Sequence, residues 1–323
     1  MSWTVADITA LLDDETLIVG EPAGKSFTRV APIAEADEYA LVWVNPTRPD
    51  KQQLVDATAA RIVICDAEID IHRGLANSCF LVVANPKLAL IKVLEGLFAS
   101  PPTWGIHPTA VISPDATLAD PVFIGPCSYV GRSEIGAGTR VYGNAFIYDG
   151  VRIGRNVIIH AGCVIGGDGF GFERDEAGHL LKFPQIGGVV IEDDVELQVM
   201  THVDRGALGD TIVRRGTKVD SCCHIAHNDD IGEDVLVAAH TMFSGSVTIG
   251  DRTWVGPATV FRDALSVGEE SFVAIGSLVV RDLPPGSRVM GAPARPFGKP
   301  RTIPRESPDP AADDDTPPSA EHP

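Results

Sequence analysis

The most regular feature of the chain is an apolar residue at every sixth position from residue 106 onwards. The rhythm slips by one residue after Val130, and it pauses after Ile165 and again before Val213. A period of six is neither the 3.6 of an α-helix nor the 2 of a lone β-strand. The residues in step are Ile106, Ile112, Leu118, Ile124, Val130, Ile135, Val141, Ile147, Ile153, Ile159, Ile165, Ile191, Leu197, Val203, Val213, Val219, Ile225, Ile231, Val237, Phe243, Ile249, Val255, Phe261, Val267, Val273 and Val279.

This hexapeptide rhythm predicts a parallel β-helix, in which three six-residue sides make one triangular coil and each coil stacks on the last. The sixth-position side chains then fill the interior. A β-sandwich would instead show period-two alternation and hairpin turns. We therefore expect a mainly β protein whose β-helix spans 105–297, with loops at 166–185 and 204–212, where the count is interrupted.

Residues 1–104 follow a different pattern, that of a small α/β domain. Its expected elements are a helix that begins at Val5, buried strands at 61–67 and 79–85, and a helix that begins at Pro86, a favoured first helical residue. Two interpretations stay open for this domain. It either binds substrate or only packs beside the β-helix.

Composition restricts the class of partner. The 26 basic and 44 acidic residues give a net charge of −18, which argues against a general binder of nucleic acid or anionic membrane. The N-terminus has no basic segment, and no apolar run approaches the length of a membrane span, so we expect a cytoplasmic protein. Six scattered cysteines without C-x-x-C spacing fit reduced thiols. Residues 298–323 are rich in Pro and Asp and are expected to be disordered.

Two residues stand out as candidates for catalysis. His227 lies two places after the interior residue Ile225, so its imidazole should face outward. Asp263 follows 36 residues later, which is two coils of 18 residues. Stacked strands are ~4.8 Å apart, so the two side chains should share an outer face at a separation of roughly 10 Å, enough to hold a substrate. A turn-forming aspartate without a functional role is the alternative for Asp263.

Other chemistries receive less support from the sequence. The segment 222–227, together with His160, His202 and His240, offers thiolate and imidazole ligands for zinc. However, His224 and His227 hold different hexad positions, so we expect no metal site and no bound cofactor. The stretch 281–305 is rich in basic residues within an acidic chain, which makes it either a phosphate-docking site or a solvated linker. Its candidate donor-binding residues are Arg281, Arg288 and Arg295.

Four segments carry a family resemblance. GDGFGF (167–172), KFPQIG (182–187), HVDRGALGDTIV (202–213) and CHIAHN (223–228), in this order and spacing, resemble UDP-3-O-(3-hydroxyacyl)glucosamine N-acyltransferase of lipid A biosynthesis. The resemblance implies a left-handed β-helix, a homotrimer and active sites in the clefts between subunits. It also implies an acyl carrier protein or acyl-coenzyme A as acyl donor and a nucleotide-linked amino sugar as acceptor.

The resemblance assigns roles to individual residues. His227 matches the general base, Asp220 matches an acidic residue that orients it, and Asp263 lies beside the position of a second active-site histidine. Acceptor binding falls to residues of the matched segments and of the N-terminal domain, namely Trp43, Asn45, Asp168, Phe170, Phe172, Lys182, Gln185 and Asn228.

The chain also departs from the family pattern. The second histidine falls on Ala264, and the aromatic pair that stacks on uracil falls on Val42 and Arg48. The segment 276–295 resembles the ending of coenzyme A-dependent sugar acetyltransferases. We expect an N-acyltransferase that uses a thioester donor and a nucleotide-linked amino sugar. The alternatives are a coenzyme A-dependent sugar N- or O-acetyltransferase outside lipid A synthesis, a zinc hydratase and a trimeric scaffold without enzyme activity.

Overall fold

The computed structural model describes residues 1–12, 16–71, 78–296 and 298. The expectation of disorder for 298–323 falls, apart from Gly298, outside these residues. The chain divides into two compact units between Pro102 and Thr103, two residues before the boundary placed from the sequence. No helix in the described ranges is long and apolar enough to cross a membrane.

The N-terminal unit is built on a small, mostly parallel sheet. Its strands lie in the order β2 (Leu17–Val19), β7 (Cys79–Val82), β6 (Ile62–Cys65), β5 (Ala40–Trp43) and β4 (Arg29–Val30), and only β2 is antiparallel to its neighbour. The other elements are β1 (Trp3–Thr4), α1 (Val5–Thr9), β3 (Ser26–Phe27), the 3₁₀ turn η1 (Ile33–Glu35), α2 (Lys51–Ala57), α3 (Pro86–Val93) and the π-helical segment η3 (Leu94–Phe98). The first and last expected helices and both expected strands are therefore present.

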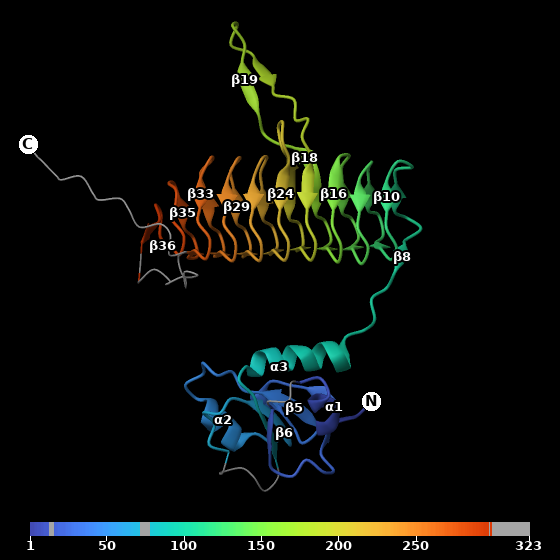
Figure 1. Cartoon of the computed structure of the whole chain (residues 1–323), viewed down its shortest axis with the longest axis vertical. Helices are drawn as coiled ribbons and strands as arrows, with labels where there is room; N and C mark the ends of the chain where they lie inside the picture. Colours follow the sequence, from blue (N-terminus) through green and yellow to red (C-terminus); the bar gives the residue numbers. More distant parts are fainter. Residues whose placement is uncertain (13–15, 72–77, 297, 299–323) are drawn as a thin grey trace, which may run out of the picture. The chain divides into compact units, whose positions relative to one another are not determined.

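The second unit is a left-handed parallel β-helix with three faces, as the hexads and the family resemblance together predict. We name two of the faces by their outward side chains and the third by its number of strands. Figure 1 shows their short strands stacked in register.

The histidine face carries His202 and His224. Its strands are β9 (Val111–Ile112), β12 (Tyr129–Val130), β15 (Phe146–Ile147), β18 (Val164–Asp168), β23 (His202–Arg205), β26 (His224–Ile225), β29 (Met242–Phe243), β32 (Val260–Phe261) and β35 (Leu278–Val279).

The ion-pair face carries ion pairs between neighbouring coils, such as that of Arg214, directly after β24, with Asp230. Its strands are β10 (Thr117–Leu118), β13 (Glu134–Ile135), β16 (Val151–Ile153), β21 (Val189–Ile191), β24 (Thr211–Val213), β27 (Asp230–Ile231), β30 (Thr248–Ile249) and β33 (Ser266–Val267).

The long face has the most strands. They are β8 (Gly105–Ile106), β11 (Phe123–Ile124), β14 (Arg140–Val141), β17 (Ile158–Ile159), β22 (Glu196–Leu197), β25 (Lys218–Val219), β28 (Leu236–Val237), β31 (Trp254–Val255), β34 (Phe272–Val273), β36 (Arg288–Met290) and β37 (Arg295–Pro296).

The interior of the coils confirms the hexad reading. The in-step residues from Ile124 to Val279 are buried in one continuous apolar core. Each buried Val, Ile or Leu side chain contributes about 1.5–3 kcal/mol by leaving water. Small residues close the corners of the triangle from inside. Thr217 is typical, because its hydroxyl donates to the carbonyl of Gly232 (2.7 Å) and accepts from the N–H of Val235 (3.0 Å) in the next coil.

Both interruptions of the hexad count leave the regular coil. The longer one forms an antiparallel hairpin of β19 (Phe172–Arg174) and β20 (Leu180–Lys182), which projects from the β-helix (Figure 1). In the shorter one, β23 and β24 take up the ends of the segment, and residues 206–210 make the loop between them. Both loops begin at the histidine face, next to the corner that carries His227.

Candidate active site

His227 lies at the corner between the histidine face and the ion-pair face, two residues after β26. Its side chain is half-buried between two glycines that belong to other parts of the chain. A Cβ atom on Gly245, in the next coil, would lie 2.4 Å from Cε1 and 2.7 Å from Nε2 of the imidazole. A Cβ atom on Gly169, in the hairpin loop, would lie 2.6 Å from the Cβ of His227. Only glycine fits at these two positions without moving the ring.

Asn228 fixes the tautomer of His227. The side-chain oxygen of Asn228 accepts the N–H of Ala207 (3.0 Å), and a backbone N–H can only donate, so the orientation of the amide is settled. The same oxygen lies 3.3 Å from Nδ1 of His227, which must therefore carry the proton. The lone pair is left on Nε2, the nitrogen beside Gly245. His227 is thus prepared to accept a proton at Nε2.

Asp263 lies on the same corner as His227, as the sequence predicts. Strand register places residue 227 beside residue 245, and 245 beside 263, because His224 pairs with Met242 and Met242 pairs with Val260. The next pairing, of Phe261 with Val279, extends this column to Arg281. The column therefore runs from an imidazole past a glycine and a carboxylate to a guanidinium, with an estimated ~4.8 Å between successive members.

A second cluster lies on the histidine face beside His227. His202 and His224 are paired across β23 and β26, and their rings meet edge to face at 5.5 Å. The buried carboxylate of Asp204 lies 2.9 Å from Nε2 of His202 and 3.7 Å from Nε2 of His224. The 2.9 Å contact is poorly aligned, so Nε2 of His202 has no true hydrogen-bond partner among the described residues.

The charges of this cluster act on His224. Burial is the main cause of a lowered pKa for this imidazole, which favours its neutral form. The carboxylate of Asp204 opposes the shift, whereas the neighbouring imidazoles of His202 and His227 add to it. At neutral pH, His224 therefore presents an uncharged ring beside the candidate base.

The hairpin loop brings most of the predicted acceptor residues to this corner. Asp168 pairs with Arg205 in the strand register and forms an ion pair with Lys182. Phe170 is 85% exposed and contacts Phe172, with ring centroids 5.1 Å apart. Gln185 is buried, and its amide donates to the carbonyl of Phe183, but its oxygen has no partner among the described residues.

Asp220, which the family resemblance implies as an orienting acid, contacts other groups than His227 within one chain. It follows β25, so it lies at the corner between the long face and the histidine face, one corner away from His227 in the same coil. Its carboxylate accepts the N–H groups of Ser221 (2.7 Å) and Ala239 (3.2 Å). The seven-residue interval between Asp220 and His227 crosses a whole side of the triangle, and the orienting role implied by the family resemblance stays a prediction. Within one chain, Asn228 contacts the imidazole in its place.

The predicted residues of the N-terminal unit have structural contacts of their own. Trp43 packs partly buried against the core beneath the sheet, and Asn45 accepts hydrogen bonds from the N–H and hydroxyl of Thr47. Val42 is fully buried in β5, and Arg48 is engaged in a two-point ion pair with Asp50 (2.6 and 2.8 Å). Val42 therefore offers no aromatic surface for a base, and Arg48 offers only a half-exposed guanidinium whose edge is held by Asp50.

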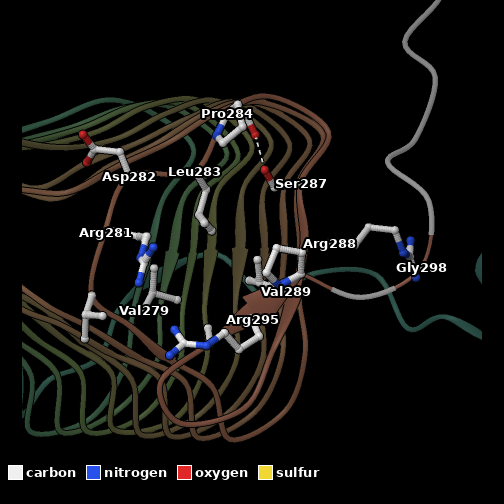
Figure 2. Close-up of a pocket in the computed structure, with 13 residues that line it drawn as sticks. Val279, Arg281, Asp282, Leu283, Pro284, Ser287, Arg288, Val289, Arg295 and Gly298 are labelled. Carbon is white, nitrogen blue, oxygen red and sulfur yellow. Dashed lines mark hydrogen bonds between the residues drawn. The ribbon is translucent and has the colours of Figure 1, made fainter. Parts of the chain in front are cut away.

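The three predicted donor arginines converge at the last coils of the β-helix. They line one cavity of about 360 Å³, whose apolar wall includes Leu283 and Val289. Figure 2 looks into this cavity and shows Arg281 and Arg295 at its edge. Arg288 lies with its guanidinium carbon 4.5 Å from the centre of the Phe272 ring.

The sequence candidates for zinc ligands form no metal-binding cluster in the described ranges. The described ranges contain no group of three or more His, Cys, Asp or Glu side chains that could hold a metal ion. His160, one of the sequence candidates, instead contacts Glu196 (2.9 Å) on the long face and stacks on Tyr142.

Sequence reasoning missed three participants in this corner: Asp204, Gly245 and Asp229. Asp204 stands within the motif 202–213 but was not singled out. Gly245 lies 18 residues after His227, so coil arithmetic alone could have marked it as a neighbour. Asp229 is fully buried at a hexad corner position where Thr, Cys, Ser, Val or Leu stands in nearby coils.

Comparison with known proteins identifies relatives along most of the chain. Residues 132–167 match the model of the bacterial transferase hexapeptide family (six repeats). The UDP-3-O-acylglucosamine N-acyltransferase 1 of Gloeobacter violaceus is 34% identical over 317 residues, which cover 91% of this chain and 88% of the relative. The corresponding enzyme of Pseudomonas fluorescens is 37% identical over 70% of this chain and 68% of its own length.

Solved structures agree on the fold. The UDP-N-acetylglucosamine acyltransferase of Francisella novicida is 26% identical and superposes with a TM-score of 0.55 over 60% of this chain and 70% of that structure. The enzyme of the same name from Campylobacter jejuni is 25% identical, also with a TM-score of 0.55, over 60% of this chain and 74% of its own.

Proposed function

Because this chain belongs to the UDP-3-O-acylglucosamine N-acyltransferase family, we propose that it transfers an acyl group from a phosphopantetheine thioester to the amino group of UDP-3-O-acylglucosamine. The membership makes the chain an acyltransferase. The choice of acceptor and donor and the roles of single residues are the proposal. The single observation that carries it is the position of His227, whose Nδ1 contacts the acceptor oxygen of Asn228 while Nε2 lies beside Gly245, at a corner kept open by two glycines.

The chemistry needs one base and one site for negative charge. The neutral amine of the sugar attacks the thioester carbonyl, a C–N bond forms, and Nε2 of His227 accepts the proton that the nitrogen loses. The tetrahedral intermediate then collapses, the C–S bond breaks, and the proton returns from His227 to the leaving thiolate. A positioned base of this kind contributes about 100- to 10,000-fold to the rate.

The backbone of Gly245 is our candidate for binding the developing oxyanion. In the described part of the chain its N–H has no acceptor, whereas the N–H of the next residue, Ser246, donates to the carbonyl of His227 (2.9 Å). A backbone N–H aimed at the oxyanion does not need to reorganise during the reaction. Asp263 cannot supply this hydrogen bond when it is ionised, because a carboxylate only accepts.

The donor fits along the corner column. Arg281 lies three coils from His227, which at ~4.8 Å per coil is about 14 Å, so a phosphate bound at the guanidinium leaves an extended arm to reach the base. The outer ladder beside the column is apolar, with Met242 and Leu278 exposed. Arg288 and Arg295, at the cavity beyond, extend the basic surface toward a carrier protein or a nucleotide.

The acceptor occupies the other side of His227 in this proposal. Asp168, Lys182 and the buried amide of Gln185 surround the sugar, and Phe170 and Phe172 cover apolar parts of the substrate. Trp43 and Asn45 remain candidates for the nucleotide.

We further propose a homotrimer, because the outward strand residues of the histidine face include no acid, lysine or arginine from β9 to β35, except at the ends of β18 and β23. A cytoplasmic location stays a prediction.

One acceptor alternative has a specific observation in its favour. Val42 and Arg48 stand where the family places its aromatic uracil-stacking pair, and neither is aromatic. A different amino-sugar nucleotide, acylated from coenzyme A, would account for this loss.

The product mass tests these assignments. The protein and its His227→Ala variant are incubated with UDP-3-O-acylglucosamine and either 3-hydroxyacyl carrier protein or acyl-coenzyme A. We expect one acyl mass added to the acceptor by the wild type and at least a 100-fold slower reaction in the variant. Equal rates for the two proteins would refute His227 as the base. No product from either donor would refute the acceptor and move the search to other amino-sugar nucleotides.

A further inference from the structure

A buried carboxylate interrupts the regular hydrogen bonding of the β-helix directly beside His227. Along the histidine face, the N–H that follows a two-residue strand commonly donates to the next coil, as in Ser244 to Phe261 (3.2 Å) and Arg262 to Val279 (2.9 Å). The equivalent donor in the coil of His227 is the N–H of Ala226. It turns to the carboxylate of Asp229 instead (2.8 Å), and the β26–β29 ladder holds only the pair His224 and Met242.

Asp229 itself has no exposed surface. Its second oxygen accepts the N–H of Val247 in the next coil (2.8 Å). At another corner, the hydroxyl of Thr217 accepts the N–H of Val235 in the same way. The bond to Ala226 has no such parallel, because the hydroxyl at the corresponding position of other corners donates to a carbonyl. Thr241, for example, donates to the carbonyl of Ala238 (2.8 Å). The carboxylate of Asp229 therefore accepts the N–H of Ala226, whereas a hydroxyl at this position would leave that N–H to bond with the next coil.

The two bonds hold the backbone on both sides of the imidazole. Ala226 immediately precedes His227, and Val247 closes the turn that begins at Gly245, against which the ring lies. On the far side, the hydroxyl of Thr211 accepts the N–H of Asn228 (2.8 Å), whose φ of 62° is held in the left-handed region. This left-handed corner recurs one and two coils later, at Ser246 and Ala264, so the Ala226 bond to Asp229, and not the φ of Asn228, distinguishes the coil of His227.

We propose that Asp229 is a positioning residue, which aims His227 at the reacting amine by withdrawing the Ala226 N–H from the coil-to-coil ladder. The inference rests on His227 as the base of the proposed function. A threonine at position 229 would restore the ordinary corner, keep the bond to Val247 and return the Ala226 N–H to the next coil. The imidazole would then follow the direction that the other coils give to residues at this corner.

The test compares Asp229→Thr and Asp229→Asn with a matched control, Thr253→Val. Thr253 is a buried corner residue whose hydroxyl accepts the N–H of Ser271 (3.3 Å), away from His227. For each protein, we would measure kcat and KM, the melting temperature, and the rate at which diethyl pyrocarbonate modifies His227, followed by mass spectrometry.

We expect both Asp229 variants to melt as folded proteins and to lose about 10- to 100-fold in kcat, as a reacting group displaced by about 1 Å does. Their KM should stay within about twofold of the wild type, because no substrate contact is removed. The modification rate of His227 should change severalfold in Asp229→Thr and stay constant in Thr253→Val.

Three results would overturn the proposal. They are a wild-type kcat and modification rate in Asp229→Thr, an equal loss of kcat in Thr253→Val, and unfolding of both Asp229 variants, which would make the carboxylate a purely structural group. Failure of the proposed function looks different. The wild type would then transfer no acyl group, while Asp229→Thr would still change the reactivity of His227.

Discussion

Gly245→Ala is the sharpest single perturbation of the candidate site, because it adds one methyl group directly against the base. The new Cβ would lie 2.4 Å from Cε1, 2.7 Å from Nε2 and 2.9 Å from Nδ1 of His227. Ordinary contact begins at about 3.4 Å, so the ring must retreat by about 1 Å. The backbone of residue 245 has no positive φ, so alanine is otherwise tolerated there.

The ring has little space into which it can retreat. The hairpin loop packs on its other side, where a Cβ on Gly169 would itself lie 2.6 Å from His227. A displacement of about 1 Å at a reacting group costs about 100-fold in rate. We therefore expect Gly245→Ala to lower kcat by about two orders of magnitude with little change in KM, because the substrate contacts remain.

Gly209→Ala is the matched control. The added Cβ would lie 3.9 Å from the side-chain nitrogen of Asn228, an ordinary contact in the same neighbourhood. Steady-state acyl transfer, with the melting temperature of each variant, completes the assay. A Gly245→Ala enzyme with kcat within about threefold of the wild type would refute the packing of His227 against this glycine. An equal loss in Gly209→Ala would assign the effect to the loops in general.

Three further predictions follow from charge and burial. Arg281→Gln should raise the KM for the acyl donor by about tenfold and weaken the salt dependence of this KM, whereas Arg140→Gln on the long face should change neither. A KM for the donor that is the same in Arg281→Gln as in the wild type would refute the docking role. Burial raises the pKa of Asp229 from 3.8 to about 8, so the folded state holds this proton more tightly than the unfolded state does. The stabilisation that comes from this bound proton is thus present at low pH, and the free energy of unfolding falls by up to about 1.4 kcal/mol per pH unit as the pH rises toward 8. In urea unfolding, the free energy of unfolding of Asp229→Thr should therefore depend less on pH than that of the wild type. An unchanged pH dependence would contradict the raised pKa. Iodoacetamide should label Cys127 and Cys222 in the native protein long before the four buried thiols. Peptide mapping would measure the order of labelling, and early labelling of a buried thiol would refute the prediction.

The sequence predicts the fold well because a hexad is a local rule that repeats. Each interior position from Ile124 to Val279 is set by its own turn of six residues, and a single register carries the rule through the stack. The same arithmetic correctly places Asp263 two coils beyond His227. It also places Arg281 three coils beyond, a consequence that the count contains but that becomes evident only once the faces are known.

The parts that the sequence could not supply depend on which corner a residue occupies and on contacts made by loops. Asp220 is only seven residues from His227, yet it lies at another corner and binds backbone N–H groups. Gly169 comes from the hairpin loop, whose path no hexad describes. Asp229 was detectable as an acid at an interior corner position, but no pattern of residue types encodes its hydrogen bond from the N–H of Ala226.

The stacking of coils fixes the distances that are possible between two residues on the same corner of the β-helix. Residues 18 apart in sequence lie one coil apart in space, so the distance between the base and the arginine at the end of the column can change only in steps of ~4.8 Å. Insertion or removal of 18 residues between Gly245 and Arg281 would lengthen or shorten the interval by one step without altering any corner. A change that is not a multiple of 18 would either leave the coil as a loop, as residues 206–210 do, or move the arginine onto a different face. In a β-helix of this kind, the length of donor that spans from the arginine to the base is therefore set by a whole number of coils.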